Sequence, residues 1–166
     1  MKKVFVIIGS LIVLVLGYWL VSPLFITKRV NEGLPVGDVL PSPTGVVSEI
    51  ETGVIPSAVS SSKTIATGQF AGLAGHSAQG TAVILEVGGK RYLRLESDFK
   101  VTNGPDLFVH LGKNDKYASE ARLGPLKGNE GSQNYEIPVN LNLAEYNEVW
   151  VWCRSFSVPF GKALLK

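Results

Sequence analysis

The chain has 166 residues, of which 45% are hydrophobic, and it carries 16 basic and 14 acidic residues. This length allows one modest domain and an additional segment. The opposite charges are interspersed and form no basic run, which argues against nucleic acid as a partner. One cysteine and two histidines are too few for a zinc site of four protein ligands without carboxylates, so no metal site is predicted.

The N-terminal segment is the most apolar part of the chain. Residues 4–26 are 23 positions without a charge, and a helix of this length crosses a bilayer core of roughly 30 Å. A cleaved signal peptide has a shorter apolar core, about 7–15 residues, that ends at small residues. This segment instead ends with Tyr18, Trp19, Pro23 and Phe25. The pattern therefore predicts an uncleaved, single-pass transmembrane signal anchor.

Three regions are expected along the chain. Residues 1–28 form the anchor, residues 29–64 a linker rich in proline, glycine and serine, and residues 65–166 a β domain. Residues 46–50 could instead add a strand to the domain. A short basic start before an apolar helix usually directs the export of the residues after that helix, so the domain is placed outside the cytoplasm.

Short strands separated by turns are predicted throughout residues 65–166. The stretches "TAVILEV" and "KRYLRLE" flank Gly88-Gly89, as in a tight β-hairpin. Leu93 and Leu95 then share one face of the second strand. Further strands are predicted in "DFKVTNGPDLFVHLGKN", "SQNYEIPV", "EVWVWC" and "FGKALL". About eight short strands, with no helix beyond one turn, indicate an all-β sandwich or barrel.

Cys153 is the only cysteine, and it comes directly after two tryptophans in "VWVWC". Without a second cysteine, it cannot form an internal disulfide. Strand alternation puts Cys153 on the face of Val149 and Val151, opposite the tryptophans and Arg154. If the valine face is the core, the cysteine is a small buried hydrophobe. If the tryptophan face is the core, it lies outside beside a guanidinium that favours the reactive thiolate.

Three other polar residues invite an assignment. His76 lies in the glycine-rich loop "GLAGHSAQG", where a β scaffold can present a ligand, although a loop histidine is more often only solvated. His110, in "LFVHLG", is expected to be an edge or half-buried histidine without a role. Asp106 comes after Pro105 and is expected to cap a turn or hold the start of its strand.

Composition also limits the cofactors. C-x-x-C-H is absent, which excludes haem attachment of the c type, and Met1 is the only methionine, which excludes a methionine axial ligand. The dinucleotide and phosphate-binding glycine motifs are absent as well. A bare thiol at Cys153 remains, or a cofactor held by Cys153 and His76.

Four stretches carry a resemblance to a known family: "GQFAGLAGHSAQGTAVI", "YLRLESDFKVTNGPDLFVHL", "LGPLKGNEGSQNYEIP" and "YNEVWVWCRSFSVPFGKALL". In this order, over residues 67–165, they resemble the DM-thirteen, or electron-transfer DM, domain. The resemblance implies a β-rich, extracytoplasmic domain with Cys153 in redox chemistry, as a bare thiol or holding a group such as haem. It places the family's motif histidine on His76 and leaves the redox partner protein unidentified.

Three hypotheses are open for the function. The first is a membrane-anchored redox or electron-transfer module that uses Cys153. The second is a non-catalytic surface module that binds protein or glycan, with "WVWC" only part of its core. The third is a cysteine transpeptidase of the sortase type, which the adjacency of Arg154 to Cys153 and the lack of a T-L-x-T-C motif disfavour. No motif assigns an enzymatic activity.

Overall fold

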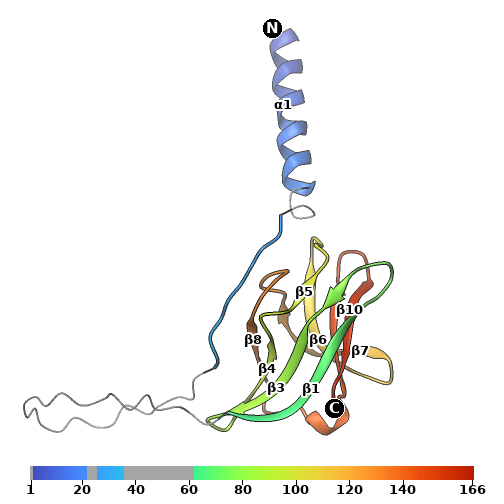
Figure 1. The fold of residues 1–166 in the computed structure, drawn as a ribbon. Coiled ribbons are helices and arrows are strands. Elements are labelled where there is room, and N and C mark those ends of the chain that lie inside the picture. The colour runs from blue at the N-terminus through green and yellow to red at the C-terminus, as the bar shows by residue number, and fades with distance from the viewer. Residues whose placement is uncertain (1, 22–25, 36–61) are drawn as a thin grey trace, which may run out of the picture.

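The computed structural model describes residues 2–21, 26–35 and 62–166, which form an N-terminal helix, a short extended segment and an all-β domain (Figure 1). The helix, α1, spans Lys2–Val21. Its side chains are described for residues 7–18, and the aliphatic ones among them, such as Leu11, Val13 and Leu14, are exposed.

Within residues 2–21, 26–35 and 62–166, no helix is both long and apolar enough to cross a membrane. The predicted anchor, residues 1–28, extends over 1–6 and 19–25, whose side chains lie outside the described part. The alternative strand at residues 46–50 lies outside it as well. The three predicted regions therefore remain predictions.

The β domain is built from ten strands. They are β1 (Lys63–Gly72), β2 (Ala78–Gln79), β3 (Thr81–Val87), β4 (Lys90–Leu95), β5 (Lys100–Val101), β6 (Leu107–Lys113), β7 (Lys116–Pro125), β8 (Gln133–Ile137), β9 (Glu148–Cys153) and β10 (Val158–Leu164). Eight of them form one antiparallel sheet in the order β7-β6-β9-β10-β1-β3-β4-β8, and β2 pairs with β5. The predicted all-β fold of about eight strands is confirmed.

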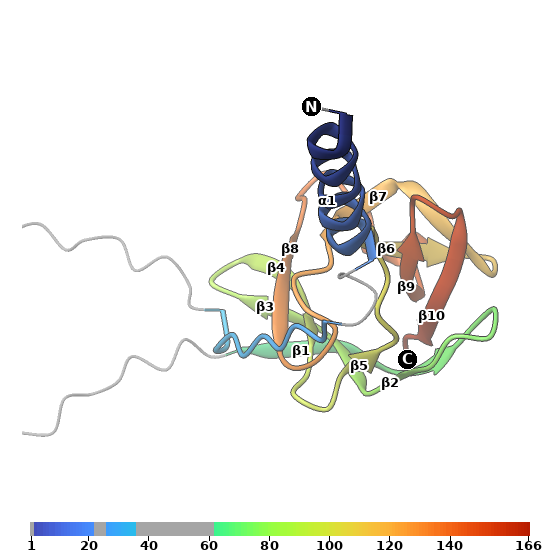
Figure 2. The ribbon, with the colours of Figure 1, turned by 90° about the horizontal axis from the view of Figure 1, so that it is seen from above.

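The large sheet curls into a nearly closed barrel (Figure 2). Its edge strands β7 and β8 approach each other at Tyr135, whose hydroxyl donates to the carbonyl of Pro125 at 3.3 Å. Burial raises the pKa of Tyr135 well above the ordinary value of a phenol, so the hydroxyl remains a donor. Side-chain packing at this seam protects two edges that would otherwise be open.

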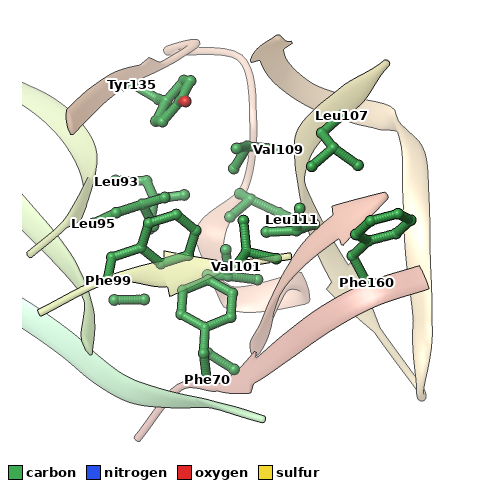
Figure 3. Close-up of a cluster of buried hydrophobic side chains, with 14 of the residues drawn as sticks. Phe70, Leu93, Leu95, Phe99, Val101, Leu107, Val109, Leu111, Tyr135 and Phe160 are labelled. Atoms are coloured by element: carbon green, nitrogen blue, oxygen red, sulfur yellow. The ribbon is translucent and has the colours of Figure 1, made fainter. Parts of the chain in front are cut away.

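The hairpin of β3 and β4 has the predicted turn. Gly88 and Gly89 both have positive φ, 58° and 77°, which a two-residue turn of type I′ requires. Leu93 and Leu95 share one face, as the alternation predicted, and the structure shows that this face is fully buried. Figure 3 shows these leucines among aromatic and aliphatic side chains from other parts of the barrel, including Phe99 in the loop before β5 and Val109 on β6. One face of each strand therefore fills the barrel.

Residues 28–33, which we call the docked segment, lie against the loop before β8 and against that strand. Val30 and Glu32 donate their backbone N–H groups to the carbonyls of Glu130 and Ser132, both at 2.9 Å. A side chain at Gly131 would collide with the carbonyl of Val30, so this close approach depends on glycine. Part of the predicted linker thus packs on the domain.

Candidate functional site at Cys153

The thiol of Cys153 lies inside the barrel. Cys153, Val149 and Val151 are all 0% exposed and belong to one apolar cluster. Of the two arrangements that strand alternation allowed, the structure has the one with the valine face as the core. The sulfur is thus shielded from solvent in the folded chain, and a buried thiol in apolar surroundings is normally inert.

The residues around Cys153 belong to one end of the barrel. Leu107 on β6 and Val158 on β10 are its cross-strand partners. A Cβ atom built on Gly104 would lie 2.9 Å from the side chains of both Leu107 and Phe160. Leu107 and Phe160 therefore meet at Gly104, and Leu107 is also the cross-strand partner of Cys153. Figure 3 shows both side chains in the buried cluster, to which Cys153 belongs as well.

His76 covers this end from outside. Its imidazole stacks on the ring of Phe160, with centroids 3.6 Å apart and planes inclined by 9°. Leu73 donates its backbone N–H to the carbonyl of Phe160 at 3.1 Å, and His76 donates to the carbonyl of Leu73 at 2.9 Å. The half-buried histidine and its turn thus form a lid over Phe160, which is itself 2% exposed. We call residues 73–76 the His76 turn.

The packing around Cys153 does not fit a haem-sized group. Cys153, Phe160 and Leu107 are all buried in one contiguous apolar cluster, and the ring of His76 is occupied by its stacking on Phe160. A haem between Cys153 and His76 would have to displace that ring. Among the described residues, no three His, Cys, Asp or Glu side chains gather as a metal site. Of the two chemistries left open, the bare thiol is the one that these neighbours accommodate.

Asp106 and Arg154 form an ion pair at the same end. The Arg154 guanidinium donates to the Asp106 carboxylate at 2.8 Å, the Ser155 hydroxyl donates to it at 3.1 Å, and the Arg154 N–H donates to the Asp106 carbonyl. The hydrogen bond from Arg154 holds the pKa of Asp106 below its usual value. Asp106 thus fixes the turn after Cys153. Arg154 is directed to this carboxylate on the outside, away from the thiol.

His110 is more deeply buried than predicted, at 5% exposed. Its Nδ1 lies 3.2 Å from the carbonyl oxygen of Ala118. Desolvation lowers the pKa of His110, and the nearby positive charge of Arg122 lowers it further. The ring packs edge-on to Tyr117, on the outer face of the sheet. Neither Tyr117 nor Arg122 was singled out from the sequence. The sequence carries only a weak signal for them in "KYASEAR", because the inward Ala118 and Ala121 are small and, being three positions apart, break the alternation of a strand.

The barrel and its buried thiol coincide with one family model. The model described as Electron transfer DM13 matches residues 69–165, which include the His76 turn, Cys153 and most of the strands. Searches of curated proteins and of solved structures each returned no match. The matched region is more than half of the chain, and it agrees with the resemblance found in the sequence. The chain belongs to the electron transfer DM13 family.

Proposed function

We propose that the chain is a membrane-anchored, extracytoplasmic redox module whose reactive group is the thiol of Cys153. The observation that carries the proposal is that the electron-transfer family model matches residues 69–165, which hold most of the barrel strands and this single thiol. Thiol–disulfide exchange is the redox chemistry that a lone cysteine can perform without a cofactor.

The proposed reaction is an exchange with a disulfide on a partner protein. Cys153 loses its proton to solvent, and the thiolate attacks one sulfur of the partner disulfide. A mixed disulfide forms while the partner's S–S bond breaks and its other sulfur leaves as a thiolate. A thiol of a second partner protein then attacks the first partner's sulfur in the mixed disulfide. A new disulfide forms between the two partners, and Cys153 leaves as a thiolate and takes up a proton from solvent. Each cycle therefore passes through one covalent complex.

Because the thiol is fully buried, the proposal includes a local opening. The His76 turn is the natural place for it: Ala74 and Gly75 have positive φ, and His76 is held by one stacked ring and one backbone hydrogen bond. Moving this turn would expose Phe160 and then the end of the barrel where Cys153 lies. Local openings of this kind cost less free energy than global unfolding.

Glutathione disulfide tests the reaction. The full chain in detergent is incubated with an excess of the reagent, and intact mass is recorded for the native protein and for Cys153→Ser. We expect one glutathione adduct on the native chain, with release of one glutathione thiolate, and none on the variant. If the folded native chain stays unmodified while the urea-unfolded chain reacts, the redox role of Cys153 is wrong.

The anchor is proposed from residues 4–26, which carry no charge, and from the exposed aliphatic side chains of α1. A helix that exposes Leu11, Val13 and Leu14 in water would be costly, and a bilayer would cover them. We expect the full chain to stay in the membrane pellet after alkaline carbonate extraction. A chain beginning at Lys28 should move to the supernatant. A full chain that stays in the supernatant would contradict the anchor. Protease added outside intact cells should digest the β domain if that domain is extracytoplasmic.

A further inference from the structure

The outer face of the barrel carries a continuous set of aromatic rings. Phe108 and His110 on β6 lie opposite Trp152 and Trp150 on β9, and Tyr117 comes from β7. The ring of Tyr117 lies 4.1 Å from that of Trp152 and 5.1 Å from that of His110. We call these five residues the outer aromatic face. Within this face, His110 and Trp150 are buried, and the other three rings are partly exposed.

Two hollows lie side by side on this face, and both are lined by Tyr117, Ser119 and Trp152. The first has a volume of about 200 Å³ and is completed by Phe108, His110, Arg122 and Arg154. The second has a volume of about 450 Å³ and is completed by Asp115, Lys116, Trp150 and Pro159. The rings of Tyr117 and Trp152, in contact and inclined by 30°, therefore separate two neighbouring binding volumes. An extended ligand that crosses this pair would occupy both.

The hollows are bordered by cations that lack an acidic partner. Arg122 lies over the Phe108 ring, 5.3 Å from its centroid, and Lys116 lines the second hollow. Among the described residues, no carboxylate forms an ion pair with Arg122 or Lys116. Arg154 and Asp115 on the same face are already paired, with Asp106 and Lys162. Glu148, on the same side of β9, is buried and its carboxylate accepts a hydrogen bond from Trp150 Nε1 at 2.8 Å. Two unpaired cations against this one carboxylate leave the charge on the face positive.

We propose that the outer aromatic face binds an anionic polysaccharide. The faces of aromatic rings carry negative charge density and attract the polarised C–H groups of a pyranose ring, as they attract other positive edges. Trp152 and Tyr117 would hold sugar rings, while Arg122 and Lys116 would bind the carboxylates of successive units. This site lies on the opposite side of the sheet from Cys153 and does not depend on the redox proposal.

Two other classes of macromolecule fit these observations less well. Nucleic acid needs many phosphate contacts, and residues 64–166 hold eleven basic and ten acidic side chains. A protein interface also uses aromatic residues and arginine, but its core is depleted of lysine, whereas Lys116 lines the second hollow itself. Divided hollows with aromatic walls and flanking cations suit a chain of acidic sugars best.

The experiment uses the full chain in detergent with polygalacturonate as the probe, and dextran and single-stranded DNA of similar length as comparisons. Binding is followed by tryptophan fluorescence and by affinity electrophoresis. We expect polygalacturonate to bind, with an affinity that falls as salt increases. Equal binding of dextran, tighter binding of DNA, or no binding of polygalacturonate would each overturn the proposal.

Matched variants locate the site. Trp152→Ala and Arg122→Gln should each weaken binding roughly tenfold. Tyr92→Ala removes a ring from the outer side of β4, and Lys63→Gln removes a charge at the start of β1, so both should leave binding unchanged. Cys153→Ser should also bind like the native chain. The near-ultraviolet circular dichroism spectrum shows whether each variant is folded. If Trp152→Ala and Arg122→Gln keep both the native spectrum and the native affinity for polygalacturonate, the proposed site is wrong.

Discussion

The two faces of strand β9 differ in how completely they are enclosed. On the inner face, Val149, Val151 and Cys153 are entirely buried, so their contacts are fixed by the barrel. On the outer face, Trp152 is only partly buried and its ring packs at a tilt against that of Tyr117 beside two hollows. The same six residues thus supply a sealed thiol on one side and an accessible aromatic surface on the other.

This difference separates two kinds of function. A group on the inner face can react only after some part of the barrel opens, so its chemistry is controlled by the lid over it. A group on the outer face meets its ligand directly, and its affinity is decided by rings and charges. Mutations on the two faces should therefore affect different measurements.

The largest expected effect comes from the inner face. Leu111→Ala removes a fully buried side chain and should lower the free energy of unfolding by about 2–5 kcal/mol. The matched control is Leu164→Ala on β10, where the side chain is 47% exposed and the cost should stay within about 0.5 kcal/mol. Urea unfolding of both variants measures the difference. Equal losses would mean that the barrel is not packed as described.

Substitution of Cys153 should lower the free energy of unfolding by less than Leu111→Ala does. Cys153→Ser places a hydroxyl in an apolar site and should cost about 1–3 kcal/mol, because the hydroxyl loses its hydrogen bonds with water. Cys153→Ala avoids that penalty and leaves only a small cavity. Chemical unfolding should therefore show that the serine variant is less stable than the alanine variant. The reverse order would place the sulfur in a polar environment.

The stability with which the docked segment binds to the domain should depend on pH. Burial raises the pKa of Glu32, but hydrogen bonds from Lys127 and Asn134 outweigh it, so that the pKa lies below its usual 4.5. A lowered pKa in the folded state stabilises docking above about pH 4.5, and this contribution is lost as the pH falls through the lowered value.

Hydrogen exchange at the amides of Val30 and Glu32 is the measurement for this prediction. After correction for intrinsic rates, protection should be high at pH 6 and should fall below pH 4. Glu32→Gln should exchange faster at pH 6 and change little with pH. Protection that is unchanged from pH 6 to pH 3 in the native chain would contradict the role of Glu32.

The smallest effect is expected at the ion pair outside the thiol. Asp106→Asn removes the pairing with Arg154, whose side chain is 62% exposed, and should cost less than about 1 kcal/mol. The thermal midpoint should therefore shift by only a few degrees. A loss as large as that of Leu111→Ala would mean that Asp106 holds the barrel end and not only the turn after Cys153.

The strands were predictable where the sequence contains strong local signals. Gly88-Gly89 defines the β3–β4 turn, and the alternation around Leu93 identifies the inward face. The inward face of β9 could not be decided, because valines and tryptophans are both apolar and only the register with β6 and β10 orients them. Strand β7 was missed, since its inward residues include the small Ala118 and Ala121.

The candidate site was predictable only in part. The sequence identified Cys153 and His76, but not Phe160, which lies under the imidazole. That stack depends on a bulge between Pro159 and Gly161, which no local pattern shows. The docked segment was unforeseen for a related reason. It is bound through backbone carbonyls and beside glycines such as Gly131, features that depend on tertiary approach and not on hydrophobic periodicity.

The most direct test of the redox account is the rate at which iodoacetamide labels Cys153 in the folded full chain, measured at rising urea concentrations below the unfolding transition. The account predicts slow labelling that is nearly independent of urea, because a local opening exposes little surface. His76→Ala should increase the rate roughly threefold to tenfold by removing the ring stack, while His76→Phe, which keeps it, should not. A rate that rises with urea in parallel with global unfolding, and that His76→Ala leaves unchanged, would show that the thiol is sealed in the native barrel and would contradict its redox role.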